Sequence, residues 1–319
     1  FARMAAEGCT HVVMEVSSHA LTLDRVAGVH FKVGTFTNLT EDHLDFHRDM
    51  EDYCDAKGLL FRMCEIGCVN ADDPWTARLV KDATCRILRY SAKGGAELRA
   101  KNIALFPSCV EFDAVAGAEQ ARIRLGIPGA FSVYNALGVI QSAQALGIPL
   151  AQIAASLETA KGVKGRAEVV PTPGKDYTVL IDYSHTPDSL ENILNTVRGF
   201  CRGRVIAVFG CGGDRDPFKR PVMGGIAARL ADVAVVTSDN PRTENPDEII
   251  RQIVAGMKGS EPVVIENRPK AIEWALAHAQ KDDVIVLCGK GHETYQEIGH
   301  EKRHLDEREV VASYLERSV

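Results

Sequence analysis

Four short apolar runs in the second half of the sequence each end in a polar loop that contains glycine or proline. With their loops, the runs read TVLIDYSHTPDSL, RVIAVFGCGGDRD, VAVVTSDNPRT and VIVLCGKGHET, and helical patterns separate them. Continuously apolar strands that alternate with helices are typical of a parallel sheet covered on both faces. Such sheets bind ligands beyond the carboxyl ends of their strands. The side chains expected at that edge are Asp182, His185, Asp214, Arg215, Asp239, Asn240, Arg242, Lys290, His292 and Glu293.

The first half of the chain also alternates between helix and strand patterns. Strands are expected at residues 11–16, 33–37 and 66–70, and short β segments at 85–125. Two helices follow, the second at 150–160. The segment 161–166, KGVKGR, is small, basic and rich in glycine, which is typical of a domain boundary. The sequence therefore predicts an α/β protein of two domains, residues 1–164 and 165–319.

The composition excludes several classes of protein. The 319 residues carry a net charge of −6, so the chain lacks the positive charge by which proteins bind nucleic acids. No apolar run approaches the roughly 20 residues that a membrane-spanning helix needs, so we expect no membrane insertion. The nine cysteines are scattered, which suits reduced thiols in the cytoplasm better than a disulfide framework. We expect a cytoplasmic monomer that acts on small molecules.

Residues 37–61, TNLTEDHLDFHRDMEDYCDAKGLLF, join a polar cluster to a helix with a lysine on its apolar face. Lys57 falls on the same helical stripe as Tyr53, Cys54 and Phe61. Such a lysine either covers the core with its stem and keeps its charge in water, or is buried as a neutral amine. A neutral amine can react with carbon dioxide to form a carbamate, an anionic ligand for a divalent ion. The helix pattern alone favours the first interpretation.

Residues that can offer oxygen or imidazole ligands to a divalent metal ion precede this helix. Glu15 ends the expected strand 11–16, a position where sheets of nucleotide-hydrolysing proteins commonly hold a carboxylate directed at Mg²⁺. The polar cluster adds Asn38, Asp42, His43, Asp45 and His47. Mg²⁺ prefers carboxylate and water oxygens and tolerates a histidine. The alternative for Glu15 is an acid that is exposed to solvent at a strand end. The alternative for the two histidines is a surface turn in which their hydrogen bonds are satisfied.

The loop Asp239-Asn240-Pro241-Arg242 suits an amino acid. Arg242 offers a planar fork for a carboxylate, and Asp239 can meet an ammonium. The alternative is a capped loop before a helix near Pro246, with Asn245 as the N-cap. In GKGHE, the glycines permit close approach of the backbone and the final acid can also hold an amine. GCGGDRD fails the dinucleotide fingerprint because Arg215 stands at the last glycine position, which argues against a nucleotide-linked oxidoreductase.

Nine blocks in this order resemble the Mur ligase family over essentially the whole chain. They are MEVSSHAL, TNLTEDHLDFH, AKGLLF, YNALG, GRAE, DYSHTPDSLE, GCGGDRDPFKRP, DNPR and GKGHE. The resemblance implies the remainder of a central ATPase-type α/β domain in 1–164, followed by a Rossmann-like, mostly parallel C-terminal domain in 165–319. It also implies ligation with ATP as co-substrate and Mg²⁺ as cofactor. The product implied is a peptidoglycan precursor made in the cytoplasm, which ties the protein to cell wall biogenesis, cell shape and cell division.

In this family the implied reaction adds meso-2,6-diaminopimelate to UDP-N-acetylmuramoyl-L-alanyl-D-glutamate through an acyl phosphate. Members that add lysine lack the arginine of DNPR, so Arg242 implies diaminopimelate. A distal carboxylate needs a cationic partner, and lysine has no such carboxylate. The residues that match the amino-acid pocket are Arg215, Asp239, Asn240, Pro241, Arg242, Gly289 and Glu293.

The resemblance assigns further residues. Lys57 matches a carbamylated lysine that helps to hold Mg²⁺, with Glu15 and His43 as metal ligands. Ser17 and Arg25 match contacts to the UDP-muramoyl peptide, whereas Leu23 stands where many members have glutamine. The positions that match the nucleotide side are Asn135, Arg166, Asp182 and His185. Of these, Arg166 and His185 are expected, with Lys57, to support catalysis.

The phosphate-binding loop of the family, G-x-x-x-x-G-K-[ST], is not found in these residues. The chain begins with Phe1 in what reads as the end of a helix. We therefore expect a fragment that lacks its N-terminal phosphate loop and does not turn over alone. Two alternatives are a non-catalytic amino-acid-binding fragment, which has no use for Glu15, His43 and Lys57, and a related amide ligase such as a folate polyglutamylating enzyme. DNPR together with GKGHE argues against the latter.

Overall fold

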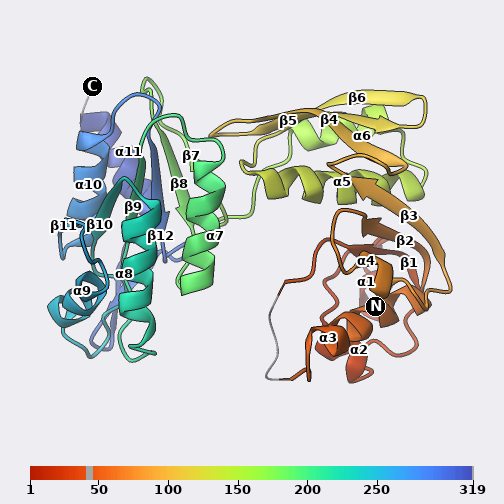
Figure 1. The fold of residues 1–319 in the computed structure, drawn as a ribbon, viewed down its shortest axis with the longest axis horizontal. Helices are drawn as coiled ribbons and strands as arrows, with labels where there is room; N and C mark the ends of the chain where they lie inside the picture. Colours follow the sequence, from red (N-terminus) through yellow and green to blue (C-terminus); the bar gives the residue numbers. More distant parts are fainter. Residues whose placement is uncertain (41–45, 318–319) are drawn as a thin grey trace. The chain divides into compact units, whose positions relative to one another are not determined.

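The computed structural model describes residues 1–40 and 46–317, which form two compact units (Figure 1). The first unit comprises residues 1–101, 114–121 and 134–153, and the second comprises 102–113, 122–133 and 154–319. Both contain sheets with parallel strand pairs together with helices, so the predicted α/β class is confirmed. The boundary predicted at 164 stays a prediction.

The first unit is built on parallel strands. β1 (Phe31–Phe36), β2 (Cys64–Asn70), β3 (Arg86–Ser91) and the start of β4 (Leu98–Leu105) pair in sequence order. The strand order continues to β5 (Val110–Ala116) and β6 (Glu119–Leu125). The strands expected at 33–37 and 66–70 are therefore confirmed to within a few residues.

Short helices accompany these strands. They are α1 (Ala2–Ala6), α2 (Ser18–Thr22), α3 (Met50–Gly58), the 3₁₀ helix η1 (Leu59–Arg62) and α4 (Thr76–Leu79), followed along the chain by α5 (Ala130–Ala145) and α6 (Leu150–Glu158). Asp49 caps α3 by accepting a hydrogen bond from the Asp52 amide at 2.8 Å. A Cβ at Gly67 of β2 would lie 2.6 Å from the Phe61 ring, so the glycine lets η1 pack against the sheet.

The strand expected at residues 11–16 is wrong. These residues form neither helix nor strand in the described structure, and the Val13 side chain is fully exposed at 100%. An apolar run becomes a strand only where a neighbouring strand satisfies its backbone groups. β1, at the end of the strand order, pairs with β2 alone. Glu15 therefore lies in an exposed segment without regular secondary structure and not at the end of a strand.

The sheet of the second unit has the order β11-β10-β9-β12-β8-β7. The four predicted strands are β8 (Thr178–Asp182), β9 (Val205–Phe209), β10 (Val233–Val236) and β12 (Val284–Cys288), and all run parallel. At the edges, β11 (Val263–Val264) is parallel to β10, and β7 (Glu168–Val170) is antiparallel to β8. A separate hairpin pairs β13 (Tyr295–Ile298) with β14 (Glu301–His304).

Helices cover both faces of this sheet (Figure 1). Apolar side chains of α7 (Pro187–Arg198), α8 (Lys219–Leu230) and α9 (Pro246–Ala255) pack against one face. Those of α10 (Arg268–His278) and α11 (Glu307–Arg317) pack against the other. Consecutive side chains of β9 alternate between the two cores, which explains why the strand sequence is apolar throughout.

The helix that follows DNPR begins as predicted. Asn245 accepts a hydrogen bond from the Asp247 amide, and Pro246 is the first residue of α9. Thr186 and Asn267 cap α7 and α10 in the same way, each with a proline in the first turn.

All nine cysteines are unpaired, and they differ in exposure. Cys9 is exposed, Cys85 and Cys201 are half-buried, and the other six are buried. A search of the described helices finds none with the length and apolar character to cross a membrane.

Candidate functional site

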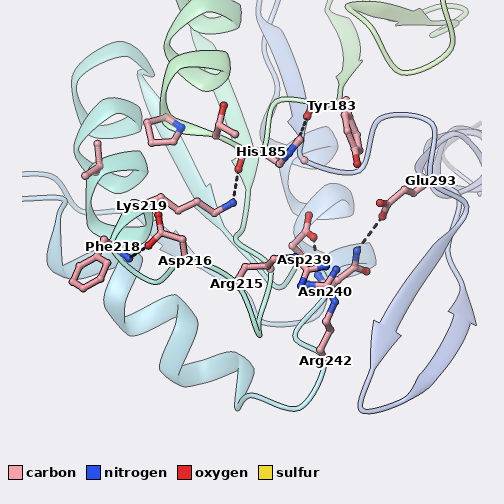
Figure 2. Close-up of a pocket in the computed structure, with 15 residues that line it drawn as sticks. Tyr183, His185, Arg215, Asp216, Phe218, Lys219, Asp239, Asn240, Arg242 and Glu293 are labelled. Atoms are coloured by element: carbon pink, nitrogen blue, oxygen red, sulfur yellow. Dashed lines mark hydrogen bonds between the residues drawn. The ribbon is translucent and has the colours of Figure 1, made fainter. Parts of the chain in front are cut away.

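A cavity of about 680 Å³ lies beyond the carboxyl ends of β8, β9, β10 and β12 (Figure 2). Its walls come from the four polar loops that the sequence singled out. Six of the seven residues predicted for an amino-acid pocket line it, together with the predicted His185: Arg215, Asp239, Asn240, Arg242, Gly289 and Glu293. Pro241 is buried within the loop and does not line the cavity. The sequence therefore identified the loops that come together here.

The charges around the cavity are of both signs. Arg215, Arg242 and Lys219 supply cations, and Asp239 and Glu293 supply carboxylates (Figure 2). An amino acid carries both an ammonium and a carboxylate, so such a lining complements a zwitterion. Lys219 was not predicted as a site residue; its Nζ donates a hydrogen bond to the His185 carbonyl at 2.7 Å.

A buried lysine joins two of the lining residues. The Lys290 Nζ donates to Asn240 Oδ1 at 2.7 Å and to Glu293 Oε2 at 2.9 Å. Asn240 Nδ2 donates to the same Glu293 oxygen at 3.0 Å, which closes a triangle of hydrogen bonds. Lys290 is wholly buried, so its charge is balanced by Glu293 and not by water. We expected Lys290 at the rim, but the structure assigns it to the support beneath.

One of the two carboxylate oxygens of Asp239 points away from the cavity. Its Oδ1 accepts the Asn240 amide at 2.7 Å. Its Oδ2 is buried, lies 3.9 Å from the Arg268 guanidinium, and has no hydrogen-bond partner among the described residues. A Cβ at Gly289 would lie 2.7 Å from this oxygen, so only glycine leaves room for the carboxylate. The predicted contact of Asp239 with an ammonium stays a prediction.

A second buried ion pair underlies Asp239. The wholly buried Arg268 donates to Glu307 Oε1 at 2.9 Å and to the Cys288 carbonyl at 2.7 Å. Burial raises the pKa of Glu307, and the Arg268 charge opposes that rise. This pair could not be predicted from the sequence, because an arginine and a glutamate in the first turns of helices are usually exposed to solvent.

The GCGGDRD loop is tied to the DNPR loop. A Cβ at Gly213 would lie 1.9 Å from the Pro241 carbonyl oxygen, so its glycine serves the close approach of the two loops. Asp214 accepts hydrogen bonds from the Thr243 hydroxyl and amide, which hold the pKa of its carboxyl below the ordinary range. Glu244 accepts the Asp214 amide and pairs with the buried Arg220. Arg215 is exposed at the tip of the loop.

Three residues predicted for the nucleotide side lie close to β7 and β8 along the chain: Arg166 precedes β7, Asp182 ends β8 and His185 follows β8. Asp182 is buried, and its carboxylate accepts the Ala167 amide at 2.8 Å and the Ser184 amide at 2.9 Å. The His185 Nδ1 lies 2.7 Å from the Tyr183 carbonyl oxygen and donates this hydrogen bond, because a carbonyl oxygen can only accept. Arg166 is exposed, with its guanidinium 5.4 Å from the centre of the Tyr183 ring.

The predicted site residues of the first unit are spread over several segments. Glu15, Ser17 and Arg25 are exposed, and Ser17 caps α2 by accepting the Ala20 amide at 3.1 Å. Lys57 is half-buried on α3 with its Nζ 4.8 Å from the centre of the Tyr53 ring. Asn135 is exposed on α5.

One of the three predicted metal ligands and part of the polar cluster fall outside the described residues. His43, Asp42 and Asp45 lie outside those residues. His47 is buried, with Nε2 2.8 Å from the Ser18 hydroxyl and its ring stacked on Tyr53, and is thus a satisfied core histidine. No group of three or more histidine, cysteine or acidic side chains suited to a metal ion occurs in the part of the chain that the structure describes.

The fold and the cavity define a class of α/β proteins that have a polar pocket at the ends of their parallel strands. Comparison with known families identifies the family to which this chain belongs. Residues 1–143 match the Mur ligase middle domain, and residues 165–291 match the Mur ligase, glutamate ligase domain. The chain belongs to the Mur ligase family.

Its relatives carry a more specific name. The chain is 48% identical over 321 residues to the UDP-N-acetylmuramoyl-L-alanyl-D-glutamate--2,6-diaminopimelate ligase of Caldanaerobacter subterraneus, covering 100% of this chain and 66% of the relative. It is 46% identical over 316 residues to ligase 1 of the same name from Clostridium acetobutylicum, covering 99% and 66%. The chain thus spans about two thirds of the length of the curated relatives it matches.

Solved structures agree. A structure of a ligase with this name superimposes with a TM-score of 0.78 at 31% identity, covering 98% of this chain and 66% of that one. The UDP-N-acetylmuramate-alanine ligase of Thermotoga maritima gives a TM-score of 0.61 at 22% identity, covering 90% and 59%, and shows the fold alone.

Proposed function

We propose that the chain is the amino-acid-binding and part of the ATP-binding portion of a cytoplasmic ligase. The reaction adds meso-2,6-diaminopimelate to UDP-N-acetylmuramoyl-L-alanyl-D-glutamate with hydrolysis of ATP. The observation that carries the proposal is the cavity at the strand ends, where Arg242 and Arg215 lie with Asp239 and Glu293. The names of the relatives support the choice of substrate.

The choice of amino acid depends on Arg242. Diaminopimelate differs from lysine by a carboxylate at its far end, and a guanidinium binds a carboxylate through two parallel hydrogen bonds. When lysine binds, the donors of this guanidinium that face the cavity meet no carboxylate, so lysine is disfavoured. Glu293 and Asp239 provide negative charge for the ammonium groups of the same ligand.

The reaction proceeds in two steps. The γ-phosphoryl group of ATP passes to the D-glutamyl γ-carboxylate, which gives ADP and an acyl phosphate. The amine of diaminopimelate then attacks the acyl carbon, and phosphate leaves as the amide forms and the amine loses a proton. The cavity residues orient the amine, and His185, which lines the same cavity, is proposed to support catalysis.

Mg²⁺ neutralises the phosphoryl oxygens when it is bound in such a site. The exposed carboxylate of Glu15 and a carbamate formed on Lys57 would provide the anionic oxygens that Mg²⁺ prefers, and we propose that these two residues and His43 would hold the ion. Arg166, Asn135 and Asp182 are proposed for the nucleotide, and Ser17 and Arg25 for the muramoyl peptide.

Calorimetric titration of the 319-residue chain with meso-diaminopimelate and with L-lysine tests the substrate. We expect diaminopimelate to bind roughly 100-fold more tightly, because lysine offers no carboxylate to the Arg242 donors that face the cavity. In Arg242→Ala this preference should fall to within about threefold while lysine binds as before. Arg303→Ala is the matched control, since Arg303 is exposed on β14 and pairs with Glu301. A wild-type chain that prefers lysine, or binds neither amino acid, contradicts the proposed function.

A chimera tests the ligation itself. In it, this chain replaces the matching two thirds of the Caldanaerobacter relative, and phosphate release from ATP is followed with each amino acid. We expect release that depends on both the muramoyl dipeptide and diaminopimelate. A chimera that binds diaminopimelate but releases no phosphate would favour a non-catalytic amino-acid-binding protein.

A further inference from the structure

The hairpin β13–β14 holds the backbone of the DNPR loop. The Arg242 amide donates to the Glu297 carbonyl at 3.1 Å, and the Gly299 amide donates to the Arg242 carbonyl at 2.7 Å. Arg242 and Ile298 form an isolated parallel bridge. Arg242 is therefore bound to the hairpin as if it were one residue of a third strand.

This attachment stabilises an unusual conformation. Arg242 has a φ of +49°, in the left-handed region that non-glycine residues rarely adopt. Such a conformation persists where surrounding contacts over-determine it, and it is common at ligand sites. The two backbone hydrogen bonds from the hairpin are contacts of this kind.

Glu297 also holds the Arg242 side chain. The Arg242 Nε donates to Glu297 Oε2 at 3.1 Å, and Nη1 donates to the Gly213 carbonyl at 2.7 Å. Nη2 has no hydrogen-bond partner among the described residues, and Arg242 lines the cavity (Figure 2). One edge of the guanidinium is thus fixed by protein, and donors on Nη2 are left for a ligand.

The same hairpin orders the other polar residues of the loop. The Glu297 amide donates to Asn240 Oδ1 at 2.9 Å, and the Gln296 side chain donates to the Asp239 carbonyl at 2.7 Å. Glu297 therefore contacts both Arg242 and Asn240, although it does not line the cavity.

Two opposite effects of Glu297 on a bound carboxylate have to be compared. Its negative charge lowers the attraction of Arg242 for a second carboxylate, but it also holds the guanidinium in place before the ligand arrives. The side chains of Arg242 and Glu297 are 20% and 28% exposed, so solvent screens part of the charge effect. Arginine loses much conformational freedom when it is fixed, so we expect positioning to dominate.

We propose that Glu297 is a positioning residue that determines selectivity for an amino acid with a distal carboxylate. It fixes the Nε edge of Arg242 and directs the remaining donors to the cavity. This inference rests on the proposed function, because it takes diaminopimelate as the ligand that Arg242 selects.

The test compares Glu297→Ala with Glu297→Gln in the 319-residue chain. Calorimetric titration should show that Glu297→Ala weakens the binding of meso-diaminopimelate about tenfold and changes that of L-lysine less than twofold. Glutamine keeps an oxygen that can accept from Nε, so Glu297→Gln should bind diaminopimelate within about threefold of wild type. Glu301→Ala, on the exposed partner strand β14, is the matched control and should bind both ligands as wild type does.

A second experiment measures how firmly the Arg242 side chain is held in the absence of a ligand. In protein labelled with ¹⁵N-arginine, we expect the Arg242 Nε proton to exchange with water several-fold faster in Glu297→Ala, but not in Glu301→Ala. The proposal is overturned if Glu297→Ala binds diaminopimelate as tightly as wild type or more tightly, or if it loses both ligands equally. A wild-type chain that binds neither ligand overturns the proposed function instead, and this inference with it.

Discussion

Asp55, two residues before Lys57 on α3, has the most extensive ion pairing of any carboxylate in the described part of the first unit. Arg78 donates to its two oxygens at 2.9 and 2.7 Å, and Lys81 donates at 2.9 Å. The hydrogen bonds from Arg78 are the main reason that the pKa of Asp55 falls to about 2, below its ordinary 3.8. Because the side chain is 38% exposed, solvent screens this pairing considerably.

The lowered pKa predicts a dependence of stability on pH. A carboxyl whose pKa is lower in the folded state stabilises the protein above its unfolded pKa, and this contribution is lost as pH falls towards 2. We expect Asp55→Asn to lower the melting temperature at pH 7 by a few degrees and to have a much smaller effect near pH 2.5. Thermal unfolding followed by circular dichroism at several pH values measures this difference.

The control is Asp82→Asn, which removes an exposed carboxylate whose one ion-pair partner among the described residues is Arg62. It should change the melting temperature less than Asp55→Asn at pH 7. An effect of Asp55→Asn that stays the same from pH 7 to pH 2.5 would argue against the ion pairs as its cause.

At the scale of single residues, six of the ten side chains expected at the strand ends line the cavity, but the sequence did not predict what holds them there. Asp239, Arg242 and Glu293 were predicted because they lie in loops that come after apolar strands, and this is a local property of the sequence. Lys290 meets Asn240 across 50 residues of sequence, and Glu297 meets Arg242 across 55. Such pairs depend on which strands are neighbours, and no periodicity or spacing in the sequence encodes that order.

At the scale of secondary structure, Gly165 is a point where two loops touch. It follows the segment 161–164, has a φ of +76°, and a Cβ there would lie 2.3 Å from the Gly291 backbone. Gly174 has nearly the same φ, +74°, with nothing within 4 Å of its Cβ position. The two glycines thus separate the effect of backbone conformation from the effect of packing.

We expect Gly165→Ala to destabilise the protein more than Gly174→Ala. Both substitutions place alanine in a left-handed conformation, at about 1–2 kcal/mol each. Only Gly165→Ala also drives a methyl group into a neighbouring backbone, which adds about 1–3 kcal/mol. Chemical denaturation of the two variants and wild type measures the difference, and equal losses of stability would show that the loop contact yields without strain.

Strands could be predicted correctly where an apolar sequence is matched by helices on both faces of the sheet. β8, β9, β10 and β12 are apolar on both faces because helices cover both, and this produces the continuous runs in the sequence. The apolar run at residues 11–16 carries the same signal, yet it pairs with no strand among the described residues. A sequence shows that a segment can be buried, but burial also needs a partner.

At the scale of the whole molecule, the family domains and the compact units divide the chain at different residues. The two family domains match residues 1–143 and 165–291, on either side of the predicted boundary. The compact units change at residues 153 and 154, and the second unit also includes residues 102–113 and 122–133. Residues 161–164 are exposed and lie outside helices and strands, which is the condition for proteolytic cleavage.

Brief digestion with trypsin distinguishes these descriptions. We expect the first cut after Lys161 or Lys164, which intact-mass spectrometry would detect as two fragments that meet there. Lys161→Gln combined with Lys164→Gln should delay that cut several-fold. A first cut within residues 102–133 would instead place the most accessible junction in the strands β4 to β6.

The exposure of a single thiol gives the molecule a practical property. Burial raises the pKa of Cys54 and Cys68 to about 11, so these thiols stay protonated and do not react at neutral pH. Cys9 is the one cysteine classed as exposed in the described chain. A maleimide dye should therefore label the native protein first at Cys9, which offers a fluorescent reporter in the first unit without engineering the chain.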